Sequence, residues 1–265
     1  MPTQSLPAVD LYYEEYGAGD NIVVSAHMEP SLSNAYQRLL GEAGFHVYFL
    51  QLRGFGKSSH VFGPPPAAGW YPTWADDVYQ FARTKTGGQF LYTGVSHGAG
   101  VGWCLALAHP EALRAFVAVV GGPHDRTVPR TRGIGVDGAS PPPMFEVPTT
   151  DPERLRRRAE RASNQAGRYD RLSPEERAIA PGMLFPELAT NDEVAARLTQ
   201  VQVPTLLLYA AQDDIIPAEM ALLAGRSVPQ SKLVLYQDFS HSLASEAPDR
   251  LVDEVALFVK ETGRG

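Results

Sequence analysis

The chain has 265 residues, of which 44% are hydrophobic and 20% charged, so it is long and apolar enough to bury one sizeable core. Its formal net charge of −7 at pH 7 gives no general attraction to nucleic acids or anionic membrane surfaces, and we expect neither as a partner. Residues 1–19 lack the basic start and apolar run of a signal peptide, and no segment approaches about 18 consecutive apolar residues. These features predict a soluble, cytoplasmic protein.

The first part of the chain alternates between strand-like and helix-like segments. Residues 9–16 and 22–26 are β-prone and are separated by a glycine-rich turn, which predicts a hairpin at the start of a sheet. A helix at about 31–43 and an apolar strand at 45–50 follow. Strand, helix and strand in this spacing predict a parallel unit.

A stretch with three aromatic residues comes next. It follows the glycine-rich turn at 53–58, and its aromatic residues, Trp70, Tyr71 and Trp74, either line a pocket or cover the core. A helix is expected at 74–84.

The stretch from Gln89 to His109 carries the clearest chemical signal. A β-prone run at 90–93 passes through Gly94-Val95-Ser96-His97-Gly98 into an Ala- and Leu-rich helix. A serine at the apex of a strand–turn–helix junction is held in strained backbone geometry, and the flanking glycines let strand and helix approach closely. Its hydroxyl is exposed at a helix N-terminus, where N–H groups and the helix dipole favour developing negative charge. Ser96 is therefore a candidate nucleophile.

The single cysteine, Cys104, falls inside the helix predicted after Ser96. No intrachain disulfide can form from one cysteine, and no adjacent base or turn activates the thiol. We expect a buried core thiol.

After a buried strand at 115–120, the alternating pattern breaks between residues 123 and 202. Prolines are frequent there, and three helices are expected to begin near residues 151, 173 and 191, which predicts an inserted helical lid. The first of these helices carries five arginines. Glu153–Arg157 and Arg156–Glu160 have i,i+4 spacing, so we expect a solvated, ion-paired face and not a ligand site.

The sheet pattern resumes with strands at 204–209 and 232–236 and a final helix at 248–262. Strands and helices that alternate in this way predict an α/β fold, with a doubly wound and mainly parallel sheet.

In combination these residues resemble the α/β-hydrolase fold family over nearly the whole chain. Gly94-Val95-Ser96-His97-Gly98 resembles the family's nucleophile elbow, and the resemblance implies Asp213 as the acid and His241 as the base, in the family's order. It also implies a hydrolase core of residues 1–122 and 203–265, with residues 123–202 as an inserted cap. Asp214 and Asp125 are the alternatives for the acid.

Two positions depart from the family pattern. The family commonly has His-Gly after its third strand, where this chain has His27-Met28-Glu29. The resemblance implies an oxyanion hole built from the backbone N–H groups of His97 and Glu29, with Met28 as the alternative to Glu29. Gln51 replaces the usual aspartate before the Arg-Gly turn, which we expect to change loop hydrogen bonds and not the chemistry.

A serine nucleophile, in place of the aspartate of related dehalogenases and epoxide hydrolases, implies acyl-enzyme chemistry. The expected function is a serine hydrolase that cleaves an ester or lactone of a small, fairly apolar substrate. A carbon–carbon bond hydrolase of diketone-like substrates and a noncatalytic ligand-binding member of the fold are the alternatives. No clustered metal-ligand spacing or dinucleotide fingerprint is present, so we expect no metal and no cofactor.

Overall fold

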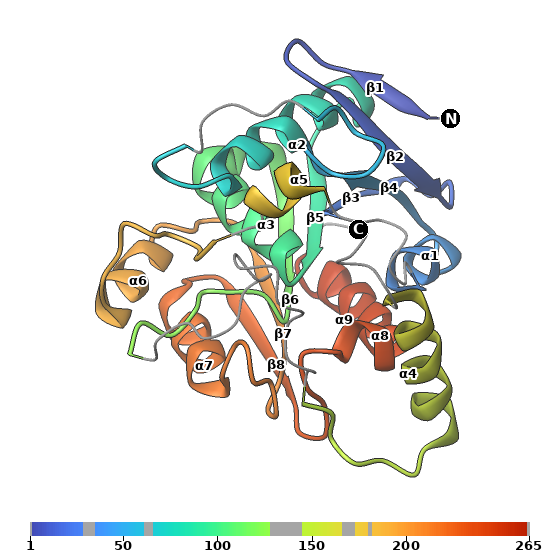
Figure 1. Ribbon diagram of the computed structural model, residues 1–265, viewed down its shortest axis with the longest axis vertical. Coiled ribbons are helices and arrows are strands. Elements are labelled where there is room, and N and C mark those ends of the chain that lie inside the picture. The colour runs from blue at the N-terminus through green and yellow to red at the C-terminus, as the bar shows by residue number, and fades with distance from the viewer. Residues whose placement is uncertain are drawn as a thin grey trace.

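The computed structural model describes residues 2–28, 35–60, 66–127, 145–165, 173–179 and 182–263. Its strands are β1 (Thr3–Ser5), β2 (Asp10–Tyr16), β3 (Asn21–His27), β4 (Phe45–Gln51), β5 (Phe90–Val95), β6 (Leu113–Val119), β7 (Thr205–Ala210) and β8 (Ser231–Tyr236). Within the described ranges they form one eight-stranded sheet in the order β1–β2–β4–β3–β5–β6–β7–β8 (Figure 1). The pairs β1–β2 and β2–β4 are antiparallel, and all pairs from β4 to β8 are parallel. The predicted α/β fold with a mainly parallel sheet is confirmed.

The expected hairpin between the first two β-prone runs is wrong, because β4 lies between β2 and β3 and pairs with both. The glycines of the connecting turn explain the difference. A Cβ on Gly17 would lie 2.1 Å from the Phe45 carbonyl oxygen, and one on Gly19 would lie 1.7 Å from the Gly44 carbonyl oxygen. These glycines let the turn cross closely over the start of β4, whose apolar side chains are buried in the sheet interior.

Helices cover both faces of the sheet. The nine α-helices of the described residues are α1 (Ala35–Glu42), α2 (Tyr71–Lys85), α3 (His97–Ala108), α4 (Pro152–Gln165), α5 (Pro174–Ala178), α6 (Asn191–Leu198), α7 (Ala218–Ser227), α8 (Leu243–Glu246) and α9 (Pro248–Glu261). One core cluster joins α2, α3 and α7 to the sheet, and a second joins α1, α8 and α9 to the opposite face. Alternate residues of β7 divide between the two, because Leu207 and Tyr209 belong to the first and Leu206 and Leu208 to the second.

The three aromatic residues before and within α2 belong to the core. Trp74 is fully buried, Tyr71 is 3% exposed and Trp70 is 9% exposed, and all three are members of the first core cluster. Helix α2 begins at Tyr71, three residues before the predicted start, with a proline in its first turn. The structure therefore favours the core-covering interpretation of this stretch.

Helices α4 and α6, both between residues 123 and 202, lie at two sides of the molecule. Helix α4 packs against α8, whereas α6 packs against α7 at the other side (Figure 1). The start of α6 is fixed by a capping box between Thr190 and Glu193. All three helices that the sequence predicts here are present, and their role as a cap stays a prediction.

No helix in the described ranges combines the length and apolarity needed to span a membrane.

Candidate active site

Ser96 occupies the junction between β5 and α3. It has φ 52° and ψ −114°, in the left-handed region that a residue with a Cβ rarely adopts. Its N–H donates to the Val119 carbonyl of β6 at 2.9 Å, and its carbonyl accepts from the Ala99 N–H at 3.0 Å. The strained backbone is thus held between the sheet and the first turn of α3.

The flanking glycines of this junction are required by close backbone contacts. A Cβ on Gly94 would lie 2.1 Å from the Gly98 carbonyl carbon, and a Cβ on Gly98 would lie 2.3 Å from the Ala26 carbonyl oxygen. Because backbone atoms are the obstacles, neither clash can be relieved by moving a side chain.

We expect Gly98→Ala to lower the free energy of unfolding by about 1–3 kcal/mol, because α3 and β3 must separate to admit the methyl group. Gly88→Ala is the matched control, since a Cβ there meets nothing within 4 Å. Urea denaturation followed by circular dichroism measures both variants. Equal midpoints for the two variants would contradict the packing argument.

The imidazole of His241 lies between Ser96 and Asp213. Its Nε2 is 2.9 Å from the Ser96 Oγ, and its Nδ1 is 2.9 Å from the Asp213 Oδ2. With the carboxylate accepting from Nδ1–H, Nε2 is the acceptor for the serine hydroxyl. The three side chains come from the junction after β5, the loop after β7 and the loop after β8, all at the carboxyl ends of strands in the parallel part of the sheet.

Asp213 is held rigidly within its loop. Its side chain is fully buried, and its Oδ1 accepts hydrogen bonds from the Ile215 N–H at 2.8 Å and the Ile216 N–H at 2.9 Å. These bonds leave Oδ2 directed at His241.

The two alternative acids make other contacts. Asp214 accepts from the Phe145 N–H through Oδ2 at 3.4 Å. Asp125 accepts from the Asn191 side chain at 2.9 Å and from both the N–H and the hydroxyl of Thr127 at 2.8 Å. Of the three candidates, Asp213 is the one whose carboxylate is hydrogen-bonded to His241.

The pKa of His241 is raised above its ordinary value of 6.5. Burial of the imidazole disfavours its charged form, but the negative charge and hydrogen bond of Asp213 and the charge of Asp214 together outweigh that effect. The positive charge of Arg161 acts in the opposite direction. The surroundings of His241 therefore favour the charged imidazolium form of its side chain.

Of the predicted oxyanion donors, the structure describes His97 and not Glu29. His97 is the first residue of α3, where the helix dipole favours negative charge. Glu29 lies outside the described residues. Met28, its alternative, has a side chain that is only 3% exposed within the first core cluster.

The other departure from the family pattern, Gln51, organises the loop after β4. Its side-chain Oε1 accepts from the Lys57 N–H at 2.7 Å, and its carbonyl accepts from the Ser58 hydroxyl at 2.6 Å. A Cβ on Gly56 would lie 1.9 Å from the Gln51 Nε2, so the glycine turn and the amide are fitted to each other. These are loop hydrogen bonds of the kind that the sequence predicts for this position.

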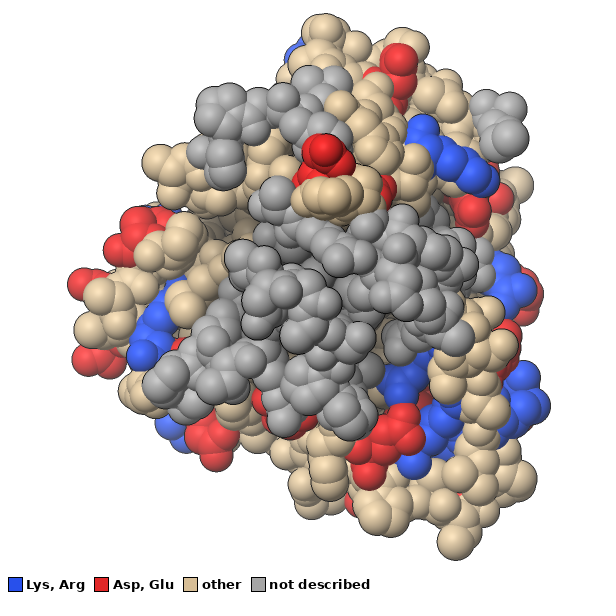
Figure 2. Space-filling model, viewed as in Figure 1, with Lys and Arg blue, Asp and Glu red and all other residues tan. Residues whose placement is uncertain are grey.

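The exposed side of α4 carries the ion pairs that the sequence predicts. Arg156, with a side chain 60% exposed, pairs with Glu153 at 2.8 Å and with Glu160 at 3.1 Å, and Arg157 pairs with Glu153 at 3.0 Å. In Figure 2, basic and acidic side chains adjoin one another at the lower right, where Figure 1 places α4.

The prediction of a solvated face is wrong for the other three arginines of α4. The side chains of Arg154 and Arg158 are 11% exposed and that of Arg161 is 8% exposed, and they pair with Glu246 and Glu146. Their i, i+4, i+7 spacing places them on one helix face, a signal that was present in the sequence. The acidic partner of Arg154 and Arg158, Glu246 on α8, is about 90 residues away along the chain, and local spacing cannot reveal it.

The single cysteine does not form a second reactive site. Burial raises the pKa of the Cys104 thiol to about 12, so the thiol stays protonated. Across the described part of the chain, no three His, Cys, Asp or Glu side chains gather closely enough to hold a metal ion.

Comparison with known proteins points to one family. A statistical description of the alpha/beta hydrolase fold matches residues 16–248. The chain is 22% identical to a pimeloyl-[acyl-carrier protein] methyl ester esterase of Vibrio atlanticus, over 95% of this chain and 98% of the relative. It is 26% identical to a putative carbamate hydrolase of Klebsiella pneumoniae, over 75% of each chain. Among solved structures, that of Est816, described as an N-acyl homoserine lactone degrading enzyme, superimposes with a TM-score of 0.71 at 20% identity, covering 97% of this chain and 100% of that one.

Proposed function

Because the chain belongs to the α/β-hydrolase fold family, we propose that it is a serine hydrolase that cleaves an ester or lactone of a small, fairly apolar substrate through an acyl-enzyme intermediate. The observation that carries the proposal is the continuous hydrogen-bonded chain from Asp213 through His241 to Ser96. It combines a serine hydroxyl, a base within 2.9 Å of it and a buried carboxylate that fixes the base.

In the proposed reaction, the Ser96 Oγ attacks the substrate carbonyl carbon while His241 Nε2 takes the hydroxyl proton. The carbonyl π electrons move to its oxygen, and the N–H of His97 and the N–H of Glu29 are the proposed donors to that oxyanion. When the intermediate collapses, the leaving alkoxide takes the proton from His241, and an acyl-Ser96 remains. Water then repeats the sequence, giving its proton to His241, releasing the acid and restoring the Ser96 hydroxyl.

The ester or lactone assignment is supported by the activities named for similar proteins. These include a methyl ester esterase and an N-acyl homoserine lactone degrading enzyme. Residues 123–202 are proposed as the cap that selects the substrate, inserted between core segments 1–122 and 203–265. On this proposal the substrate is a small molecule.

A fluorophosphonate probe and a substrate panel test the proposal. The probe labels an activated serine, so wild-type protein should be labelled at Ser96, and labelled peptide mapping by mass spectrometry identifies the site. A panel of p-nitrophenyl esters, lactones and diketones should show turnover of the first two classes. Turnover of diketones alone would replace the proposal by carbon–carbon bond hydrolysis, and absence of labelling and turnover would favour a noncatalytic binding protein.

We expect kcat/KM to fall on the acidic side with a midpoint above pH 6.5. His241 must be neutral to take the serine proton, and the neighbouring carboxylates raise its pKa above 6.5, so more of it is protonated at a given acidic pH than of an ordinary histidine. A pH profile of ester hydrolysis measures the midpoint. Asp214→Asn should lower the midpoint by removing one negative charge, and a wild-type midpoint below 6.5 would contradict the electrostatic account.

A further inference from the structure

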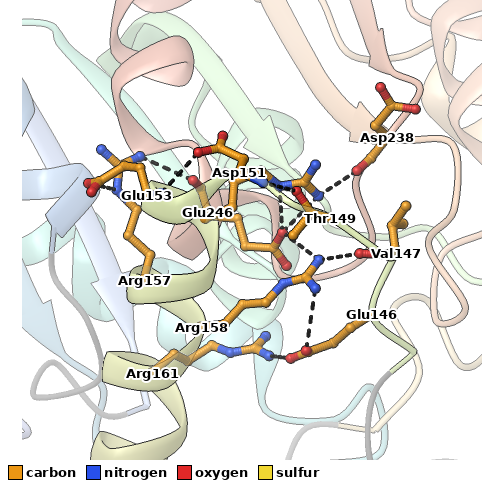
Figure 3. Close-up of polar contacts among 11 residues, drawn as sticks. Glu146, Val147, Thr149, Asp151, Glu153, Arg157, Arg158, Arg161, Asp238 and Glu246 are labelled. Atoms are coloured by element: carbon orange, nitrogen blue, oxygen red, sulfur yellow. Dashed lines mark hydrogen bonds and ion pairs between the residues drawn. The ribbon is translucent and has the colours of Figure 1, made fainter.

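Two arginines of α4 converge on one buried carboxylate of α8. Arg154 donates to the Glu246 Oε2 from Nε at 3.1 Å and from Nη2 at 2.9 Å. Arg158 donates to the same oxygen at 3.0 Å, and Figure 3 shows this contact between Arg158 and Glu246. The Glu246 side chain is fully buried, and each arginine side chain is 11% exposed. Charge-assisted hydrogen bonds in such a desolvated place are strong and directional.

The same helix also contacts the other end of the segment that carries His241. The Arg154 Nη2 donates to the Asp238 carbonyl at 2.6 Å, and its guanidinium lies over the Phe239 ring at 3.9 Å from the centroid. Arg154 therefore bridges a point three residues before His241 and a point five residues after it. Arg157 adds a hydrogen bond to the Glu246 carbonyl at 3.1 Å.

The segment between these anchors has little regular structure of its own. Strand β8 ends at Tyr236, and α8 has only four residues, too few for an independently stable helix. Within the described residues, the Phe239 carbonyl accepts from the Gln212 N–H at 3.1 Å, which ties this segment to the loop that bears Asp213. Contacts from outside the segment must therefore hold much of it in place.

Stability alone does not account for this buried cluster. The Glu246 Oε1 and the Arg158 Nε are buried without a hydrogen-bond partner, so the cluster carries a desolvation cost. Replacing such clusters with apolar side chains is often neutral or stabilising, whereas their directional geometry has no apolar substitute.

We propose that Arg154, Arg158 and Glu246 are positioning residues that hold the segment 238–246, and with it His241, in register with Ser96 and Asp213. This inference rests on the proposed function, because it takes His241 as the base. On this proposal α4 affects the catalytic step by positioning His241. This role is separate from any contact that the proposed cap, residues 123–202, makes with the substrate.

The expected kinetic effect lies in kcat. A base displaced by about 1 Å costs on the order of 10²-fold in rate, whereas substrate binding does not depend on the His241–Ser96 hydrogen bond. For Arg154→Gln and Glu246→Gln we expect kcat for p-nitrophenyl acetate to fall roughly 10- to 100-fold with KM within about twofold. The rate of fluorophosphonate labelling should fall by a similar factor, because it needs the same activated serine.

The acidic limb of the pH profile separates loss of position from loss of charge. The charged groups with the largest effect on the pKa of His241 are Asp213, Asp214 and Arg161. Removing the Arg154 cation by itself would raise the pKa of His241, whereas a loosened Asp213–His241 bond would lower it. We expect the midpoint for Arg154→Gln to move down.

One matched control and one double variant accompany these single variants. Arg156→Gln removes an arginine of the same helix whose partners are exposed, and it should retain wild-type kcat. The double variant Arg154→Gln/Glu246→Gln should lose no more than the worse single variant, because both act on one contact. If Glu246→Gln fails to fold, Arg154→Gln and Arg158→Gln, which change only α4, decide the question.

Two results would overturn the inference. One is wild-type kcat in folded Arg154→Gln and Arg158→Gln protein, even with a lowered melting temperature, since that would leave a purely structural cluster. The other is a raised acidic midpoint, which would assign the effect to charge. In either case Ser96→Ala would still be inactive, whereas an active Ser96→Ala would remove the proposed function itself.

Discussion

Ser96→Ala should reduce ester hydrolysis by on the order of 10⁴-fold or more, because the hydroxyl carries the covalent step. The fold should persist. Alanine keeps the Cβ and the same strained φ, and the backbone hydrogen bonds to Val119 and Ala99 do not involve the hydroxyl. Steady-state assays at enzyme concentrations up to the micromolar range, with thermal melts in parallel, measure both effects.

A serine outside the site provides the control for this experiment. Ser227→Ala removes a hydroxyl at the end of α7 that donates to the Leu223 carbonyl, so it should change stability slightly and leave kcat/KM unchanged. Fluorophosphonate labelling should disappear in Ser96→Ala and persist in Ser227→Ala. Wild-type activity in folded Ser96→Ala would rule out the acyl-enzyme mechanism.

Asp213→Asn should lower kcat by roughly 10⁴-fold with little change in fold. The asparagine oxygen can still accept from the Ile215 and Ile216 N–H groups, which directs the NH₂ group at His241 Nδ1. A donor in that place makes Nδ1 the acceptor and puts the proton on Nε2, so His241 can no longer take the Ser96 proton. The imidazolium also loses its buried counter-charge.

Two further aspartate variants show whether the loss is specific to Asp213. Asp214→Asn should reduce activity only mildly, because the Asp214 carboxylate acts on His241 through charge alone. Asp125→Asn should affect stability at the start of α6 through Asn191. If either variant were inactive while Asp213→Asn kept wild-type activity, the acid would have to be reassigned.

Local chemistry in the sequence was enough to predict the junction at Ser96 and the class of fold. Strand, turn and helix occupy about twenty consecutive residues there, and the requirement for glycine at Gly94 follows from its contact with Gly98, four residues further on. The requirement at Gly98 is different, because the obstacle there is Ala26 of β3. Helix starts such as those of α4, α5 and α6 were likewise predictable, since proline placement and capping residues act over three or four positions. The catalytic roles of Ser96, Asp213 and His241 stay predictions until the variants are measured.

Strand order was decided by tertiary structure. The β-prone runs of β2 and β3 have the spacing of a hairpin, yet β4 enters between them. Strands compete for partners in the sheet, and a mostly buried strand pairs where it is covered best. The order of the strands along the chain does not fix their order in the sheet.

The same limit applies to choices between chemically equal neighbours. Sequence could not decide between Asp213 and Asp214, because the hydrogen bonds from Ile215 and Ile216 that orient one carboxylate exist only after the loop has folded. The spacing of Arg154, Arg158 and Arg161 puts these three on one face of α4, but only the packing of α4 on α8 shows that Arg154 and Arg158 meet a buried Glu246 and not water. Short-range spacing determines which side of a helix a residue occupies, and the environment of that side is set by contacts between segments far apart in the chain.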